Sequence, residues 1–219
     1  MNRRSLVVTL LLSWSAAACL QCAAAAEIAN REAALAAVQS PDPALRLGGV
    51  DGLAQFGLPA DAAVLLDELY DDNAEVRLHA QGAVWQVWSR SGDPEIDALL
   101  KSGIQQLEEG RMGLAVETFT RITERLPDFA EGWNKRATAY YLMGDYDQSL
   151  KDCDEVIKRN PQHFGALSGY GLIYVKRGEL ERALEYFERA LEINPNLESV
   201  EQSIELIRYK LGQDGKQQT

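Results

Sequence analysis

The stretch WNKRATAYYLMGDYDQSL, residues 133–150, places four aromatic residues, two alanines and a Gly-Asp turn within eighteen positions. Sliding it by thirty-four residues in each direction aligns three units, residues 96–129, 130–163 and 164–197. The eighth position of every unit is small, as is the twentieth. These positions are Gly103, Ala137 and Gly171, then Ala115, Ser149 and Ala183. Because the same pattern returns at a fixed period, the stretch is one copy of a repeating packing unit.

Each unit carries the signals of two helices joined by a tight turn. The fifteenth position is always glycine, which adopts the left-handed conformation that ends a helix. These glycines are Gly110, Gly144 and Gly178. The thirty-second position is always proline, which we expect to open the next helix, where its missing N–H costs little. These prolines are Pro127, Pro161 and Pro195. Apolar residues recur at helical spacing between these marks, so each unit is predicted to be a helix, a turn and a helix.

A helix-turn-helix period of this length, with these small, aromatic and proline positions, resembles the tetratricopeptide repeat. In the middle copy, four residues stand at positions typical of that family: Trp133, Tyr140, Gly144 and Tyr146. Gln106 and Cys153 replace expected aromatic residues, which predicts slightly weaker local packing. After the third copy, residues 198–212 are predicted to form a capping helix that buries Val200, Ile204, Ile207 and Leu211 and stops at Gly212. Residues 213–219 are expected to form a flexible tail.

Residues 27–93 show a different and weaker period. The stretches PDPALRLGGVDGLAQFG and DNAEVRLHAQGAVWQVWSRSG align at an offset of thirty-one, which pairs Arg46 with Arg77. Each begins with a capping residue and continues into a helix of apolar periodicity, and helical runs near 27–38 and 60–70 precede them. A start of the type D-P-x-x-R is similar to HEAT-like repeats. The resemblance implies two helix pairs in this front segment.

The joint between the two segments is SGDPE, residues 91–95. Asp93 is predicted to cap the next helix and Pro94 to open it, which makes the joint short. Trp85 and Trp88 share one helix face, which we expect to pack against the first tetratricopeptide unit. The predicted fold is therefore all-α: a right-handed α-solenoid of two HEAT-like helix pairs (27–93), three tetratricopeptide units and a capping helix (94–212).

Residues 1–26 have the features of a secretory signal peptide. Arg3 and Arg4 precede an apolar run, and Ala24-Ala25-Ala26 offers a small-x-small cleavage site that would make Glu27 the mature N-terminus. The apolar run is shorter than the roughly 20 residues of a membrane-spanning helix. We therefore expect a periplasmic or secreted protein. An alternative is a lipoprotein anchored through Cys19, since AAAC resembles a degenerate lipobox, with Ala16 where a larger aliphatic residue is usual.

Charge and cysteine content limit the partners and the chemistry. The chain has 33 acidic and 22 basic residues, a net charge of −11, and removing Arg3 and Arg4 with the signal peptide makes this −13. Such a charge argues against nucleic acid and anionic membrane surfaces. The excess lies mainly in residues 27–95, with 12 acids and 4 bases. Cleavage leaves Cys153 as the one cysteine, so no internal disulfide is expected.

Few side chains suggest chemistry. His79, His163 and Cys153 are far apart in the repeat register, which argues against a metal cluster or a nucleophile–base pair. A structural or solvated role is expected for each histidine, and Cys153 is expected to act as a small buried hydrophobe. In YDDNAE, residues 70–75, the ligand spacing of a calcium loop is absent, so residues 71–73 are interpreted as capping residues. We expect no cofactor, no metal and no enzymatic activity.

The resemblance assigns a binding role to the first helix of each repeat, which lines a concave groove in this family. The wall positions with hydrogen-bonding, aromatic or apolar side chains in the second and third copies are Asn134, Thr138, Tyr141, Ser168, Leu172 and Lys176. Some family members hold a C-terminal carboxylate with lysine, asparagine and arginine on this wall. Here Leu100, Ile104 and Gly165 occupy corresponding positions, so that carboxylate clamp is missing.

Two functions remain open from the sequence. The leading one is an exported scaffold for protein–protein interaction, which binds a peptide or a helix of a partner of unknown identity in the concave groove. The alternative is a structural or lipid-anchored subunit of an envelope assembly, which docks through its acidic front segment or a lipid on Cys19. No nucleic acid is expected as a partner, and no membrane insertion unless Cys19 is lipidated.

Overall fold

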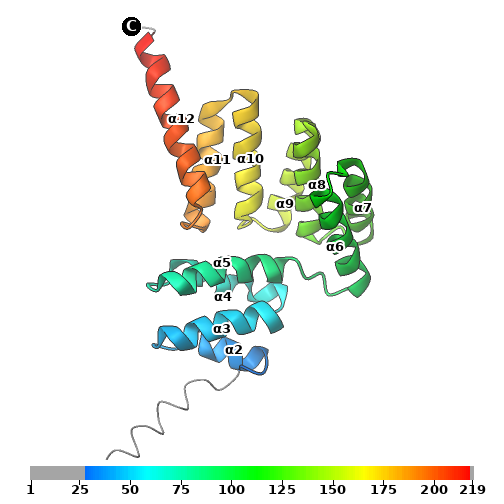
Figure 1. Ribbon diagram of the computed structural model, residues 1–219, viewed down its shortest axis with the longest axis vertical. Helices are drawn as coiled ribbons and strands as arrows, with labels where there is room; N and C mark the ends of the chain where they lie inside the picture. The colour runs from blue at the N-terminus through cyan, green and yellow to red at the C-terminus, as the bar shows by residue number, and fades with distance from the viewer. Residues whose placement is uncertain (1–27, 218–219) are drawn as a thin grey trace, which may run out of the picture.

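The computed structural model describes residues 28–217, and all regular structure in that range is helical (Figure 1). The predicted signal peptide, Cys19 and the expected mature start at Glu27 lie outside the described residues. The front segment contains α2 (Arg31–Ala37), α3 (Pro43–Phe56), α4 (Ala62–Asp67) and α5 (Ala74–Trp88). Single 3₁₀ turns, Pro59–Asp61 and Glu68–Tyr70, flank α4.

The remaining helices follow the thirty-four-residue period. They are α6 (Pro94–Glu108), α7 (Met112–Arg125), α8 (Ala130–Met143), α9 (Tyr146–Arg159), α10 (Phe164–Arg177), α11 (Leu180–Ile193) and α12 (Glu198–Gln217). The starts of α8, α10 and α12 are thirty-four residues apart, and so are those of α7, α9 and α11. The predicted all-α array of antiparallel helix pairs is confirmed.

The glycines end the first helices as predicted, whereas the prolines do not open the next helices. Gly110, Gly144 and Gly178 have φ values of 74°, 79° and 76°, in the left-handed region. Each proline, however, lies two residues after the last residue of a second helix and three residues before the next helix begins. The residue before a proline avoids the α conformation, so the proline ends the preceding helix and does not open the following one.

Small residues at the eighth position allow two helices to approach closely. A Cβ on Gly103 would lie 2.3 Å from the ring of Phe119, and one on Gly171 would lie 2.4 Å from the ring of Phe187. Phe119 and Phe187 are themselves fully buried. Glycine is required at these positions because the neighbouring ring occupies the space of a side chain.

The last helix, α12, covers the end of the array. Val200, Ile204 and Ile207 are buried against the third repeat, and Leu211 is partly buried. The helix continues through Gly212 to Gln217, beyond the expected stop. Glycine inside a helix costs only about 1 kcal/mol relative to alanine, so it weakens a helix without forcing its end.

The front segment repeats its own contacts at the offset of thirty-one. Arg46 Nη1 donates to the carbonyls of Ser40 and Pro41, and Arg77 Nη1 donates to those of Asp71 and Asp72. Arg46 also reaches the following turn, where it makes a two-point contact with Asp71. Arg77 instead reaches Asn196, in the loop between α11 and α12. Asp71 is therefore chiefly the partner of Arg46, while Asn73 caps α5.

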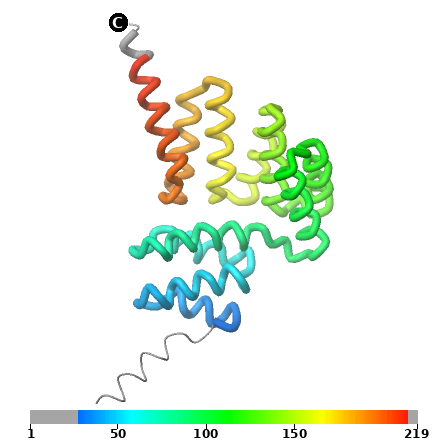
Figure 2. The backbone as a smooth tube through the Cα atoms, in the orientation of Figure 1, coloured from blue at the N-terminus to red at the C-terminus, as the bar shows by residue number. Residues whose placement is uncertain are grey.

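The front segment lies across one end of the repeat array. In Figure 1, α5 runs beneath the lower ends of α10, α11 and α12, and Figure 2 shows the chain rising through α6 and α7 before it returns above α5. Trp88 stacks on His163 at a centroid distance of 4.5 Å, and Trp85 packs against Phe164. The predicted contact of both tryptophans with the first unit is wrong. Leu100, Ile104 and Leu107 of that unit pack with Phe119 and Ile122 in a separate cluster.

Candidate functional site

A hollow of about 260 Å³ lies between α8 and α10, the first helices of the second and third repeats. Five of the six predicted wall residues line it: Asn134, Thr138, Tyr141, Ser168 and Leu172. Further lining residues are Ala137, Leu142, Ser149, Cys153, Gly165, Ala166 and Gly169. Lys176 is exposed one turn beyond Leu172 on α10 and does not line the hollow.

The five residues differ in solvent exposure and so in how accessible they are to a ligand. Thr138 and Leu172 are exposed, and Ser168 and Tyr141 are half-buried. Asn134 is buried, and its Nδ2 donates to Glu131 Oε2 at 3.1 Å. Tyr141 packs against Tyr146 at a centroid distance of 5.8 Å, and no hydrogen bond from residues 28–217 holds its hydroxyl. Thr138, Leu172 and Tyr141 are thus the predicted residues best placed for contact.

A second hollow, of about 270 Å³, continues the first along α10 toward α12. Gly165, Ser168 and Leu172 line both hollows, while Ser199, Val200 and Ser203 contribute from α12. Trp85 of α5 also lines it. We call the two hollows together the concave groove. The repeat register extended into the capping helix would have indicated Ser199, but no sequence signal places Trp85 here.

Trp85 reaches the groove because Gly165 leaves room for it. A Cβ on Gly165 would lie 2.3 Å from the far edge of the indole ring. Lys135 Nζ lies 5.4 Å from the centre of the same ring. The front segment therefore supplies part of the wall of a groove that the repeats otherwise build.

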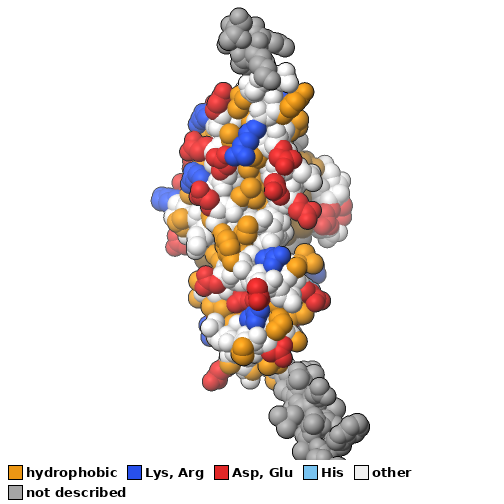
Figure 3. All heavy atoms as spheres, turned by 90° about the vertical axis from the view of Figure 1, so that its left-hand side faces the viewer, with side chains coloured by type: hydrophobic (Ala, Val, Ile, Leu, Met, Phe, Trp, Pro, Cys, Tyr) orange, Lys and Arg blue, Asp and Glu red, His pale blue; other side chains and the backbone are white. Residues whose placement is uncertain are grey.

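The groove lining carries no charge. None of the residues that line the two hollows is Asp, Glu, Lys, Arg or His. The outer face shown in Figure 3, by contrast, carries acidic and basic side chains interspersed with apolar ones. The electrostatics of the groove thus differ from those of that surface.

Four hydroxyl groups in the groove already donate to backbone carbonyls. Thr138 Oγ1 donates to the carbonyl of Asn134 at 3.0 Å, and Ser168 Oγ to that of Phe164 at 2.8 Å. Ser203 Oγ donates to Ser199 O at 2.7 Å, and Ser149 Oγ to Ala137 O at 2.8 Å. Since a hydroxyl has one proton, these groups offer a ligand only acceptor lone pairs.

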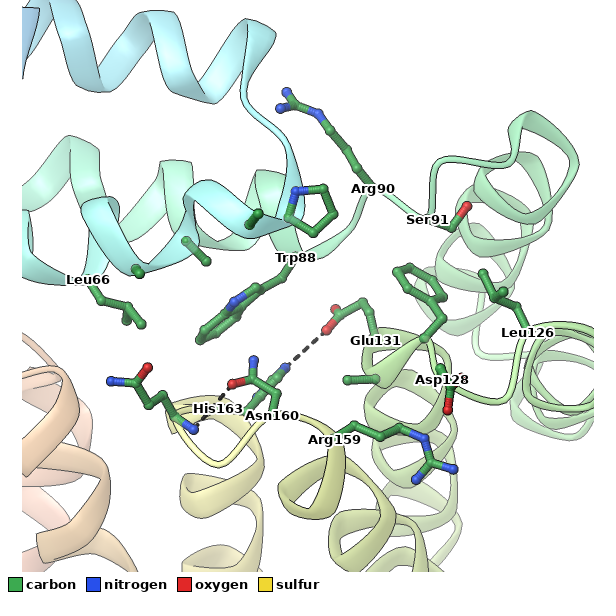
Figure 4. A pocket seen from close by; sticks show the side chains of 17 residues that line it. Leu66, Trp88, Arg90, Ser91, Leu126, Asp128, Glu131, Arg159, Asn160 and His163 are labelled. Atoms are coloured by element: carbon green, nitrogen blue, oxygen red, sulfur yellow. Dashed lines mark hydrogen bonds and ion pairs between the residues drawn. The ribbon is translucent and has the colours of Figure 1, made fainter. Parts of the chain in front are cut away.

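A larger hollow, of about 510 Å³, lies where the front segment meets the loops before α8 and α10 (Figure 4). Glu131 and His163 are fully buried beside it, with 3.2 Å between Oε2 and Nε2. The Nδ1 of His163 accepts from the N–H of Ala166, so Nε2 carries the proton that is donated to Glu131. Burial raises the pKa of Glu131, but the His163 hydrogen bond and the charge of Lys135 outweigh it and leave that pKa below its usual value.

The two arginines that line this junction already have partners. Arg90 donates to the carbonyls of Ala54 and Gly57, at the end of α3. Arg159 donates to the carbonyl of Pro127 and pairs with Glu155. These arginines are bonded within their own segments, and Trp88 stacked on His163 joins the two segments. The junction is therefore a structural contact, and the concave groove is the better candidate site.

Other features of the described residues offer little chemistry. Cys153 is a free, buried cysteine, and burial raises the pKa of its thiol to about 12. His79 is exposed and lies 2.7 Å from Asp51. No cluster of three or more metal-ligating side chains occurs between residues 28 and 217. Nor does any helix in that range have the length and apolar character needed to cross a membrane.

Comparison with known families and proteins identifies the repeats. Residues 134–198 match the tetratricopeptide repeat family model. A TPR repeat-containing protein of Rhizobium etli is 34% identical over 124 residues, which are 57% of this chain and 61% of that protein. The chain thus spans about three fifths of the length of this curated relative. Residues 134–198 are thus similar to tetratricopeptide repeats.

Solved structures show the same fold. The Sgt2 TPR domain from Aspergillus fumigatus aligns with a TM-score of 0.54 at 21% identity, covering 57% of this chain and 83% of that domain. The first TPR of Spaghetti, solved with the HSP90 peptide SRMEEVD, aligns with a TM-score of 0.52 at 23% identity and covers 53% and 93%. The aligned helix pairs of this chain therefore share the solenoid fold of these structures.

Proposed function

We propose that this protein is a scaffold for protein–protein interaction that binds a segment of a partner protein in the concave groove. The observation that carries the proposal is the open hollow between α8 and α10, where five wall residues chosen from the repeat register come together. Leu142 and Leu172 are 52% and 42% exposed there. Exposed apolar residues gathered in a hollow favour a binding site, because a partner removes their surface from water.

The Spaghetti structure, which holds a peptide in a related fold, supports a peptide-binding role. It does not support the same ligand chemistry. The positions that would form a carboxylate clamp hold Leu100, Ile104 and Gly165, and Leu100 is buried in the first unit. A partner segment is thus recognised here without a clamp for a terminal carboxylate.

We also propose export to the periplasm, which rests on the features of residues 1–26 in the sequence, with a lipid anchor through Cys19 as the alternative. The front segment is proposed to be HEAT-like, which the repeated arginine contacts at an offset of thirty-one support. The proposed role of the front segment is to supply and support part of the groove wall through Trp85. An envelope-assembly subunit would use the same groove for a neighbouring subunit.

The proposal is tested by capture from a periplasmic extract of the source cells. The bait is the mature chain, and the blocked variant is Leu172→Arg, which places a charge in the groove. Leu114→Arg is the matched control, since Leu114 is 41% exposed on α7 and lines neither hollow. We expect the same proteins to bind wild type and Leu114→Arg but not Leu172→Arg. Equal capture by all three contradicts groove binding.

A further inference from the structure

We infer that the segment held in the concave groove is an α-helix of the partner protein, which inserts an uncharged apolar face. The inference rests on the proposed function, since it specifies what that groove accepts. The sequence left a peptide and a helix as open alternatives. Three properties of the groove separate them: its lack of charge, its shortage of hydrogen-bond donors, and the shape of the α10 surface.

The lack of charge restricts the face that enters. A charged partner side chain seated in either hollow would lose water without meeting an opposite charge, because none of the lining residues carries one. Burying an unpaired charge is strongly unfavourable. Charged residues of the partner therefore remain outside the groove, and attraction between opposite charges contributes little to the contact.

The shortage of donors disfavours an extended peptide. An extended segment presents unpaired N–H and C=O groups, which require partners when they are buried. Thr138, Ser168 and Ser203 can accept from such N–H groups, but their protons are already donated to their own helices. The carbonyls of an extended segment would find few donors, namely the hydroxyls of Tyr141 and Ser199 and the indole N–H of Trp85. A helix bonds its backbone groups internally and so makes no such demand.

The surface of α10 suits the side-chain ridges of a helix. Along its groove side, Gly169 leaves a depression, Trp85 fills the room beside Gly165, and Leu172 projects one turn beyond Gly169. A Cβ on Gly169 would meet nothing nearer than the Cys153 sulfur at 3.6 Å. Ridges of side chains on one helix pack into such depressions on another. Leu142 on α8 stands opposite as a second apolar contact.

The test uses two displayed peptide libraries against the full mature chain. One presents a stable helix of about 18 residues, five turns long, with one face randomised. The other presents linear random peptides of the same length. Clones are retained if they bind wild type and the Leu114→Arg control but lose about tenfold or more affinity for Leu172→Arg.

We expect the retained clones to come from the helix library, with apolar residues at i, i+3, i+4 and i+7 of the random face and no charge among them. Their affinity should change less than about twofold between 0.05 and 0.5 M salt, because no ion pair is made. Retained clones that are linear, or that require a charged residue in the face, overturn the helix inference while groove binding stands. An absence of retained helix clones also overturns it. Groove binding itself fails if extract proteins bind Leu172→Arg as well as wild type.

Discussion

Gly171→Ala adds one methyl group where α10 meets α11. The new Cβ would lie 2.4 Å from two ring atoms of Phe187 and 2.7 Å from a third. Phe187 is 1% exposed, so its ring cannot move aside without displacing other core side chains. Gly113→Ala is the matched control, since a Cβ on this helical glycine of α7 meets nothing within 4 Å.

Two opposing effects set the size of the change. Alanine is better than glycine inside a helix by about 0.5–1 kcal/mol, which acts at both positions. Overpacking a filled core costs about 1–3 kcal/mol, which acts only at Gly171. We therefore expect Gly171→Ala to lower the free energy of unfolding by about 0.5–2 kcal/mol. Gly113→Ala should leave it unchanged or raise it by up to about 1 kcal/mol.

Urea unfolding followed by circular dichroism measures both variants against the wild type. An unchanged slope with a lower midpoint shows a loss of native stability, with no change in the surface exposed on unfolding. Gly171→Ala that is as stable as Gly113→Ala would show that the eighth repeat position is not a close helix contact.

Three further changes test the energetics of the fold. Burial raises the pKa of Glu68 to about 7. The stability contributed by the protonated Glu68 carboxyl is therefore present below the unfolded-state pKa and is lost as the pH rises through 7. Glu68→Gln should stabilise the fold at pH 8 by about 1 kcal/mol, after a discount for solvent screening, but not at pH 4. Equal shifts in melting temperature at both pH values would contradict this. Trp88→Ala removes the ring stacked on His163 and should cost about 3–5 kcal/mol in urea unfolding, so a loss below about 1 kcal/mol would place the ring outside the core. Deleting 198–219 removes three buried side chains worth about 1.5–3 kcal/mol each, whereas deleting 214–219 leaves them in place; similar melting temperatures for the two truncations would rule out a capping role for α12.

The array was predictable from the sequence because its determinants are local. Gly144 and Gly178 end first helices in the left-handed conformation, as their position in the period indicates. Asp93 caps α6 and Pro94 opens it, again from adjacent residues. The same packing positions also recur in every copy of a repeat, so a weak sequence signal in one copy is supported by the others.

The placement of the front segment was not predictable in the same way. Trp88 and His163 are seventy-five positions apart, and nothing in the apolar pattern of α5 shows which loop it will meet. The sequence left both a structural and a solvated role open for His163, which stands between two repeats. Its burial depends on Trp88 and Glu131 arriving from other elements. Apolar periodicity shows which face of a helix is buried. It does not show against which element that face packs when the two are far apart in the sequence.

The candidate groove was predicted in part. The repeat register identified Thr138 and Leu172, because first helices face the same side of the array in every copy. The register also predicted Lys176 as a wall residue, but Lys176 does not line the hollow. It could not reveal that Asn134 donates to Glu131. Trp85 was missed because it belongs to the other segment. Side chains that act within one repeat follow the period, whereas contacts between segments do not.

Site-specific photo-crosslinking tests groove binding most directly. A photoreactive phenylalanine analogue replaces Leu172 in one variant and Leu114 in another, and each mature chain is irradiated with the extract proteins that bind wild type. We predict a strong crosslink from position 172 and little from position 114. A crosslink from position 114 alone, or from neither position while binding persists, would contradict binding in the concave groove.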